Sequence, residues 1–205
     1  MFYTVRTPFF FKLLYPSCTW EMPCKSNRVY LSFDDGPHPE VTGFVLDLLN
    51  AYEARASFFC IGENVVRYPE TYNRIISEGH IVGNHTQHHK NGWKTGNREY
   101  LDDVREAQQH IDSKLFRPPY GRVSFSQLRV IQQAMQLKPI MWSLVSGDFD
   151  TAISPEACAR NVLDNMRPGD IIVFHDSEKA SERLKHALPL VLEKIKTRGW
   201  IAEKL

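Results

Sequence analysis

The sequence has little excess charge of either sign. Its 205 residues include 25 Lys and Arg against 24 Asp and Glu, which gives a formal net charge of +1. Domains that bind nucleic acid usually carry a clear surplus of basic residues, because the phosphate backbone has to be neutralised. The balance therefore predicts no nucleic-acid partner and favours a neutral or weakly charged ligand over a polyanion.

Long apolar runs are also missing. No window approaches the roughly 18 apolar residues that a bilayer-spanning helix needs, so no membrane span is expected. Near the N-terminus, Pro8, Lys12 and Pro16 interrupt the apolar residues around 9–11. A secretory signal needs an uninterrupted apolar stretch and a cleavage site of small residues, and neither is clear here. The expected location is therefore cytoplasmic.

Cysteine is sparse and is not arranged in close pairs. The cysteines, Cys18, Cys24, Cys60 and Cys158, form no CxxC motif. They are too few for a disulfide scaffold in a chain of this length, and free cysteine is among the most buried residue types. We expect free thiols in or near a core, with a Cys18–Cys24 bridge as the alternative in an oxidising compartment.

What the sequence does contain is an alternation of strand and helix patterns. Apolar or extended segments predict strands at 29–33, 56–61, 80–83, 115–118, 139–145 and 171–174. Helical patterns or helix-start signals fall at 41–54, 63–78, 100–114, 124–135, from Ser154-Pro155 onward, and from near Pro189 to around Gly199.

Repeated strand–helix units imply right-handed crossovers and a mostly parallel sheet. About seven units fit, one short of the eight of a complete barrel. The predicted fold class is therefore α/β, a distorted or incomplete (β/α) barrel of about seven strands in a single domain. A doubly wound open sheet is the alternative. Residues 1–27 lie outside the pattern and are expected to form an N-terminal extension packed on the barrel, which spans 28–205.

Two adjacent acids stand at the carboxyl end of the first expected strand. Asp34 and Asp35 are followed by Gly36 and Pro37. Barrels of this kind place their active sites at this end of the strands. A plain turn is the alternative, because Asp, Gly and Pro are ordinary turn residues. The residues alone leave both interpretations open.

A histidine cluster follows the third expected strand. On a helical turn, His85 and His89 would share one face and could bind one metal ion, while His88 offers a competing pair with His85. An acid from another strand end could supply a third ligand. Three protein ligands with one open position are typical of a catalytic zinc site. The alternative is a surface cluster without a ligand.

Two more polar residues stand at the ends of expected strands. In Arg117-Pro-Pro-Tyr-Gly121 the prolines stiffen a loop that can hold Arg117 against a carboxylate, although the same residues also suit a plain turn. His175 stands at the exit of an apolar strand. Near a metal and an aspartate it is a candidate general acid, and otherwise a hydrogen-bonded core group.

The motifs, in their order along the chain, carry a family resemblance. They are Ser32-Phe-Asp-Asp-Gly-Pro37, the His85 and His89 pair, Arg117-Pro-Pro-Tyr-Gly121 and Val173-Phe-His175. Together they resemble the motifs of the polysaccharide deacetylase family, the NodB-homology or carbohydrate esterase family 4 proteins. The resemblance runs from about residue 29 to the C-terminus. It implies that 28–205 is a catalytic domain with a distorted barrel fold.

The resemblance also implies roles for single residues. Asp35, His85 and His89 would bind a divalent metal, usually zinc. Asp34 would be the catalytic base and His175 the catalytic acid.

The third motif adds two roles, and the fourth departs from the family's pattern. The resemblance implies that Arg117 orients the base and that the backbone N–H of Tyr120 helps to hold the oxyanion. Where the family's fourth motif is generally Asp-x-x-Asp-Trp, this chain has Val145-Ser-Gly-Asp148-Phe149, so the first acid is absent. A partner for Arg117 or for the histidine then has to come from Asp148 or from elsewhere.

The reaction implied is metal-dependent removal of N-acetyl groups from an oligo- or polysaccharide, with O-acetyl groups as a variant. Two alternatives stay open: hydrolysis of a formamide, ureide or cyclic imide on the same fold, and a non-catalytic carbohydrate-binding module. Trp93, Tyr120, Trp142 and Phe149 are candidates for a sugar-binding groove and equally for the core.

Overall fold

The centre of the molecule is a curled parallel sheet. The computed structural model describes residues 3–23 and 27–205. The strands are β1 (Arg28–Asp34), β2 (Ser57–Cys60), β3 (Ile81–Asn84), β4 (Leu115–Phe116), β5 (Lys138–Pro139), β6 (Leu144–Val145), β7 (Ile171–His175) and β8 (Ile201–Glu203). Their order is β5-β4-β3-β2-β1-β7-β6, and β8 pairs with the first part of β1. This arrangement confirms the incomplete α/β barrel predicted from the sequence.

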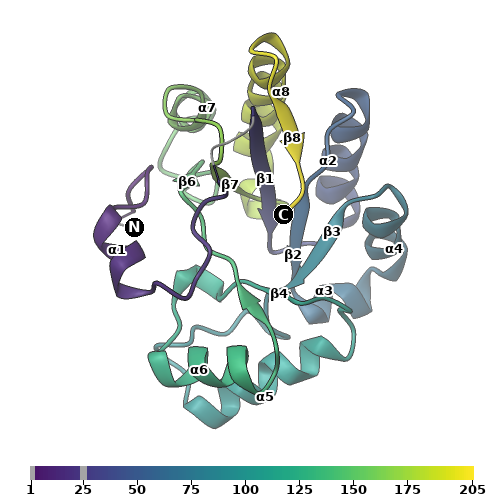
Figure 1. Cartoon of the computed structure of the whole chain (residues 1–205). Coiled ribbons are helices and arrows are strands. Elements are labelled where there is room, and N and C mark those ends of the chain that lie inside the picture. The colour runs from purple at the N-terminus through teal and green to yellow at the C-terminus, as the bar shows by residue number, and fades with distance from the viewer. Residues whose placement is uncertain (1–2, 24–26) are drawn as a thin grey trace.

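The helices lie around the outside of the curled sheet (Figure 1). They are α1 (Phe9–Leu14), α2 (Pro39–Ala51), α3 (Gly62–Arg67), α4 (Pro69–Ser77), α5 (Asn97–Gln108), α6 (Phe125–Gln133), α7 (Pro155–Leu163) and α8 (Ser181–Thr197). Single 3-10 turns occupy Pro119–Gly121 and Glu178–Ala180. Within residues 3–23 and 27–205, no helix has both the length and the apolar character that crossing a membrane requires.

Strand β1 shows how the sheet separates the core from the site. Val29, Leu31 and Phe33 are fully buried and pack in the main core with residues of the surrounding helices. Successive side chains of a strand point to opposite faces, so Tyr30 and Asp34 face the inside of the barrel. Because both faces are covered, the strand is a nearly continuous apolar run in the sequence.

The N-terminal segment lies at the gap between β5 and β6, the two ends of the strand order. Thr19 bridges to Ile140, just after β5, and Arg6 bridges to Leu144 in β6. Arg6 also forms an ion pair with the buried Asp170, with 2.8 Å between Nη2 and Oδ2. These contacts are of the kind expected for an extension packed on the barrel. The boundary at residue 27 stays a prediction.

Two expected elements are divided in the structure. The helix expected over 63–78 is split into α3 and α4, because Tyr68 precedes Pro69 and has φ −127° and ψ 58°. Proline disfavours the helical region for the residue before it. The strand expected over 139–145 becomes the two short strands β5 and β6.

The last helix begins earlier than the sequence predicted. We expected a start near Pro189, but α8 begins at Ser181 and contains Pro189 in its interior. Proline removes one helical hydrogen bond and is unfavourable there. Here Leu184, Leu188 and Val191 are fully buried, and this packing offsets the local cost. The expected start was wrong because burial overrides propensity.

The described cysteines are buried. They are Cys18, Cys60 and Cys158, and burial raises the pKa of the Cys158 thiol to about 12. Cys24 lies outside the described residues, so the alternative Cys18–Cys24 bridge does too.

Candidate active site

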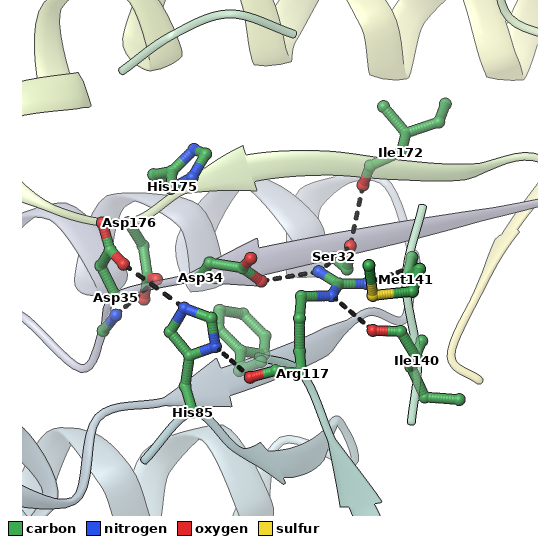
Figure 2. A network of polar contacts seen from close by, with 12 residues as sticks. Ser32, Asp34, Asp35, His85, Arg117, Ile140, Met141, Ile172, His175 and Asp176 are labelled. Carbon is green, nitrogen blue, oxygen red and sulfur yellow. Dashed lines mark hydrogen bonds and ion pairs between the residues drawn. The ribbon is translucent and has the colours of Figure 1, made fainter. Parts of the chain in front are cut away.

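The residues predicted for the site gather at one end of the barrel. Asp34 is the last residue of β1 and is the ladder partner of His175, the last residue of β7. His85 follows β3, and Arg117 follows β4. Because parallel strands bring their carboxyl ends to one edge of the sheet, these side chains come from different elements into one cluster (Figure 2).

The Arg117 guanidinium is fully buried beside Asp34. Nη1 donates to Asp34 Oδ1 at 2.6 Å and to Ser32 Oγ at 2.8 Å. Nε donates to the Ile140 carbonyl at 3.2 Å, and Nη2 donates to the Met141 carbonyl at 3.0 Å. Burial lowers the pKa of Arg117, and the contact with Asp34 opposes that change. All the donor nitrogens are therefore occupied, and the Asp34 carboxylate is fixed in one orientation.

Asp35, His85 and His89 bring three candidate ligand atoms together, all within 4.8 Å of one another. Asp35 Oδ1 lies 3.1 Å from His89 Nε2 and 3.7 Å from His85 Nε2. Although Asp35 follows Asp34 directly, its side chain lies toward the His85 imidazole and not toward the Arg117 guanidinium (Figure 2).

The protonation of His85 follows from its neighbour. Its Nδ1 lies 2.8 Å from the Arg117 carbonyl oxygen. A carbonyl can only accept a hydrogen bond, so Nδ1 carries the proton and Nε2 presents a lone pair toward Asp35. Burial, together with the nearby His89, lowers the pKa of His85 to about 4. The imidazole is therefore neutral at neutral pH, as a metal ligand has to be.

The surroundings of the Asp35 carboxylate show whether a cation fits this cluster. Its Oδ1 is buried and has no hydrogen-bond partner. Burial alone would raise the pKa of Asp35, but the neighbouring His89 and His175 outweigh it and lower this pKa well below its ordinary range. The ionised Asp35 oxygen and the unprotonated Nε2 of His85 thus face one another, 3.7 Å apart. These residues fit a divalent metal ion, and the family described below implies one.

The histidine pair lies on a loop and not on the helical turn that we predicted. Thr86 and His89 have φ values of 66° and 53°, in the left-handed region. The ring centroids of His85 and His89 are nevertheless 5.1 Å apart. The loop is supported by two polar side chains, since Thr86 N donates to Asn84 Oδ1 at 2.8 Å and Gln87 N to Asp103 Oδ2 at 3.0 Å.

His88, the competing ligand in our sequence analysis, points away from the pair. Its Nδ1 contacts Asp103 Oδ1 at 2.7 Å. With Glu106 these residues form a second group of metal-ligand types. The ammonium of Lys90 lies 3.6 Å from the same Asp103 oxygen, so positive charge is already present there. The structure thus groups His89, and not His88, with His85.

His175 is held by a buried acid from the fourth motif. Asp148 Oδ1 lies 2.8 Å from His175 Nδ1, and Asp148 Oδ2 accepts from His175 N at 2.7 Å. Burial alone would lower the pKa of His175, but the charge and hydrogen bond of Asp148 raise it to about 10. The open question of the fourth motif is answered in part: Asp148 partners the histidine, while the acid paired with Arg117 is Asp34.

Aromatic side chains flank the cluster on two sides. The ring of Tyr120 lies 4.6 Å from that of His89 and is 49% exposed. Phe149 meets the His175 ring edge-on, with centroids 5.2 Å apart. Trp93 is exposed on the surface. Of these rings, Tyr120 and Phe149 contact the histidines of the cluster.

Trp142, the fourth aromatic candidate, is partly buried and packs against the residues inside the barrel. A Cβ at Gly121, whose φ is 66°, would lie 2.8 Å from a ring carbon of Trp142. The glycine of the third motif is therefore required both by the turn and by the close approach of this ring.

Sequence reasoning missed the polar residues behind the site. Asn84 and Asp103 support the histidine loop. Asp176 accepts from Gly36 N at 3.0 Å, next to the acid pair. Asp176 directly follows His175, and this adjacency was the available signal. Nothing in the local sequence marks Asp103, because its side chain accepts from the backbone of Gln87 and His88, 16 and 15 residues away.

Comparison with known proteins adds a family and several relatives. The model of the family described as polysaccharide deacetylase matches residues 22–139. A peptidoglycan-N-acetylglucosamine deacetylase of Bacillus cereus is 32% identical over 189 residues, which is 89% of this chain and 88% of that protein. A chitooligosaccharide deacetylase of Azorhizobium caulinodans is 36% identical over 157 residues, 73% of this chain and 74% of the relative.

Solved structures show the same fold. A peptidoglycan N-acetylglucosamine deacetylase in complex with 4-naphthalen-1-yl-N-oxidanyl-benzamide superposes with a TM-score of 0.84 at 29% identity, covering 97% of this chain and 95% of that one. A family 4 carbohydrate esterase from Streptomyces lividans, in complex with acetate, gives a TM-score of 0.77 at 25% identity, with coverages of 89% and 94%. With a family model that matches more than half of its length, the chain belongs to the polysaccharide deacetylase family.

Proposed function

We propose that this chain is a metal-dependent hydrolase that removes N-acetyl groups from the amino sugars of an oligo- or polysaccharide. The observation that carries the proposal is the arrangement around Asp34. This buried carboxylate is fixed by Arg117 at 2.6 Å and adjoins in sequence the Asp35 ligand cluster. It is also the ladder neighbour of His175. A base, a candidate metal site and a candidate acid thus share one end of the barrel.

The metal proposed for Asp35, His85 and His89 is zinc, because two imidazoles and one carboxylate with an open position are typical of catalytic zinc. When bound, such an ion makes water a stronger acid and stabilises negative charge on a carbonyl oxygen. The ligand atoms are all imidazole nitrogen and carboxylate oxygen, and no cysteine sulfur of the described residues joins the cluster.

The protein groups divide the proton transfers between them. Asp34 accepts a proton from the attacking water, and the ion pair with Arg117 keeps its carboxylate aimed. The backbone N–H of Tyr120 is proposed to donate to the carbonyl oxygen as charge develops there. His175 then donates a proton to the leaving nitrogen, which leaves poorly as an anion.

The state of His175 favours an amide over an ester as substrate. Asp148 raises its pKa to about 10, so the imidazole is protonated at neutral pH and ready to donate. An alcohol leaves with much less assistance than an amine. The N-acetyl substrate is also the chemistry shared by the names of the relatives, which are deacetylases of N-acetylglucosamine in peptidoglycan and of chitooligosaccharides. The neutral sugar suits the net charge of +1, and the cytoplasmic location expected from the sequence stays a prediction.

The test is acetate release from N-acetylglucosamine oligomers. We expect release by the purified protein, loss of release after a chelator has removed its metal, and recovery on addition of Zn²⁺. Release that persists in protein shown by elemental analysis to be metal-free would contradict the metal-dependent mechanism. Release from an aryl acetate but not from the oligomers would favour O-deacetylation.

A further inference from the structure

The sharp turn after β1 carries two carboxylates that have different proposed roles. Consecutive residues, Asp34 and Asp35, supply the proposed base and a proposed metal ligand, and their carboxylates point to different partners. Asp35 achieves this with a φ of 80°, in the left-handed region that non-glycine residues rarely adopt. Such a conformation persists only where the surroundings hold it in place.

One residue holds this turn on both sides of Asp35. The backbone N–H of Asp176 donates to the Asp34 carbonyl at 3.0 Å. The Asp176 side chain accepts, through Oδ1, the backbone N–H of Gly36 at 3.0 Å. Asp176 thus contacts the residue before and the residue after the strained one, and Figure 2 shows it beside the Asp35 side chain.

The carboxylate of Asp176 is itself fixed. It is fully buried, and Oδ2 accepts a hydrogen bond from the Thr42 hydroxyl on α2. That hydroxyl accepts in turn from the backbone N–H of His38 at 2.8 Å. Asp176 therefore ties the exit of β7, the turn after β1 and the first turn of α2 into one unit.

Gly36 is adapted to this contact. A Cβ at Gly36 would lie 2.0 Å from Asp176 Oδ2 and 2.5 Å from its Cγ. No positive φ requires a glycine there, so the close approach of the carboxylate is what excludes a side chain. The other side of the turn is held by α3, since Asn64 Nδ2 donates to the Asp35 carbonyl at 2.8 Å.

We propose that Asp176 is a positioning residue that fixes the Asp34–Asp35 turn, so that the base and the metal ligand keep their relative placement. It is fully buried and acts through the turn, so its contribution falls on metal affinity and on turnover but not on substrate binding. The catalytic part of this inference rests on the function proposed above.

The first test compares Asp176→Ala with Asp176→Asn, which keeps an acceptor for Gly36 N. We expect Asp176→Ala to lower kcat by about 10²-fold, as small misplacements of catalytic groups do, with KM for the oligosaccharide changed less than about threefold. Its affinity for Zn²⁺, measured by competition with a chromophoric chelator, should fall at least about tenfold. Asp176→Asn should recover part of both losses.

A matched control is Asp170, at the other end of β7 from Asp176. Asp170 precedes β7, is also buried and bonds to Arg6 and Ser143. Asp170→Asn should lower stability while leaving kcat and Zn²⁺ affinity unchanged. The positioning role is wrong if Asp170→Asn changes kcat and Zn²⁺ affinity as much as Asp176→Ala does. It is also wrong if folded Asp176→Ala keeps both at the wild-type level.

The second test uses the contact between Gly36 and Asp176. Gly36→Ala should reduce Zn²⁺ affinity and kcat in the wild-type background, because the methyl group displaces the carboxylate. In an Asp176→Ala background the same substitution should cost much less. Equal costs in both backgrounds would overturn the proposal. The Zn²⁺ measurements do not need turnover, so failure of this inference is distinguishable from failure of the proposed deacetylase activity.

Discussion

At the scale of single residues, the candidate site contains charged side chains that are buried together with their ion-pair partners. Arg117 faces Asp34, and Asp148 faces His175. Each pair fixes the position of the group proposed to meet the substrate, and Asp148 also raises the pKa of His175. A charged hydrogen bond of this kind is strong and directional when it is shielded from water.

The pH dependence of turnover tests the second pair. Asp148→Asn removes the charge that raises the pKa of His175 to about 10, so this pKa should fall. The acid acts only while protonated, and its activity is lost as pH rises through its pKa. We therefore expect the alkaline limb of kcat against pH to move to lower pH in the variant. An unmoved alkaline limb would mean that His175 is not the titrating acid.

Sequence motifs identified the residues proposed for the chemistry, but few of the residues that position them. Asp34, Asp35, His85 and Arg117 stand at strand ends in recognisable motifs. Asp103 and Asn84 stand in no motif, and they matter only because folding brings them to the backbone of the histidine loop. Contacts of that kind depend on tertiary placement, which local patterns do not encode.

At the scale of elements, the main difference between expectation and structure is the histidine segment. A spacing of four residues favours a helical turn, but Thr86 and His89 adopt left-handed conformations. Asp103, on α5, receives the backbone N–H groups of Gln87 and His88, each at 3.0 Å. The two rings meet because a second element shapes the loop, and not because of helical periodicity.

This loop support predicts a metal-affinity effect. Asp103→Ala removes the side-chain acceptor of His88 N and leaves Gln87 N only the Asp103 main-chain carbonyl, at 3.2 Å. The loop should therefore lose its fixed shape. We expect the Zn²⁺ dissociation constant to rise by about 10–100-fold, the usual effect of removing a group that orients ligands. Glu106→Gln, on the same helix and without a contact to these backbone groups, serves as the control. An unchanged dissociation constant for Asp103→Ala would show that the loop is ordered by other contacts.

Proline had opposite effects in two helices. Pro69 marks the start of α4 and separates it from α3, as the sequence rule predicts. Pro189 lies inside α8, where the buried face of a 17-residue helix keeps it continuous. The rule at Pro69 is local, but the single helix expected over 63–78 did not apply it. The continuity of α8 through Pro189 depends on burial against the rest of the fold, which local patterns do not encode.

At the scale of the whole molecule, the parallel strand order is open between β5 and β6, and residues 3–23 lie along that gap. The alternation of patterns was enough to predict an incomplete barrel of about seven strands. It was not enough to show what covers the opening, because the covering segment has no strand pattern of its own.

The contribution of this segment can be measured through Arg6. Arg6→Met removes the ion pair with the buried Asp170 and leaves that carboxylate with fewer donors. We expect the free energy of unfolding in urea to fall by about 1–3 kcal/mol, with kcat unchanged because Arg6 lies outside the candidate site. Wild-type stability of the variant would show that the segment adds nothing at this contact.

The most direct test of the whole account is the rate of acetate release by Asp34→Asn, measured on N-acetylglucosamine oligomers with Zn²⁺ loading confirmed by elemental analysis. The substitution removes the base and leaves Asp35, His85 and His89 in place. We predict stoichiometric Zn²⁺ binding and a kcat lowered by roughly 10²–10⁴-fold. A zinc-loaded variant that turns over at the wild-type rate would contradict the assignment of Asp34 as base and the mechanism built on it.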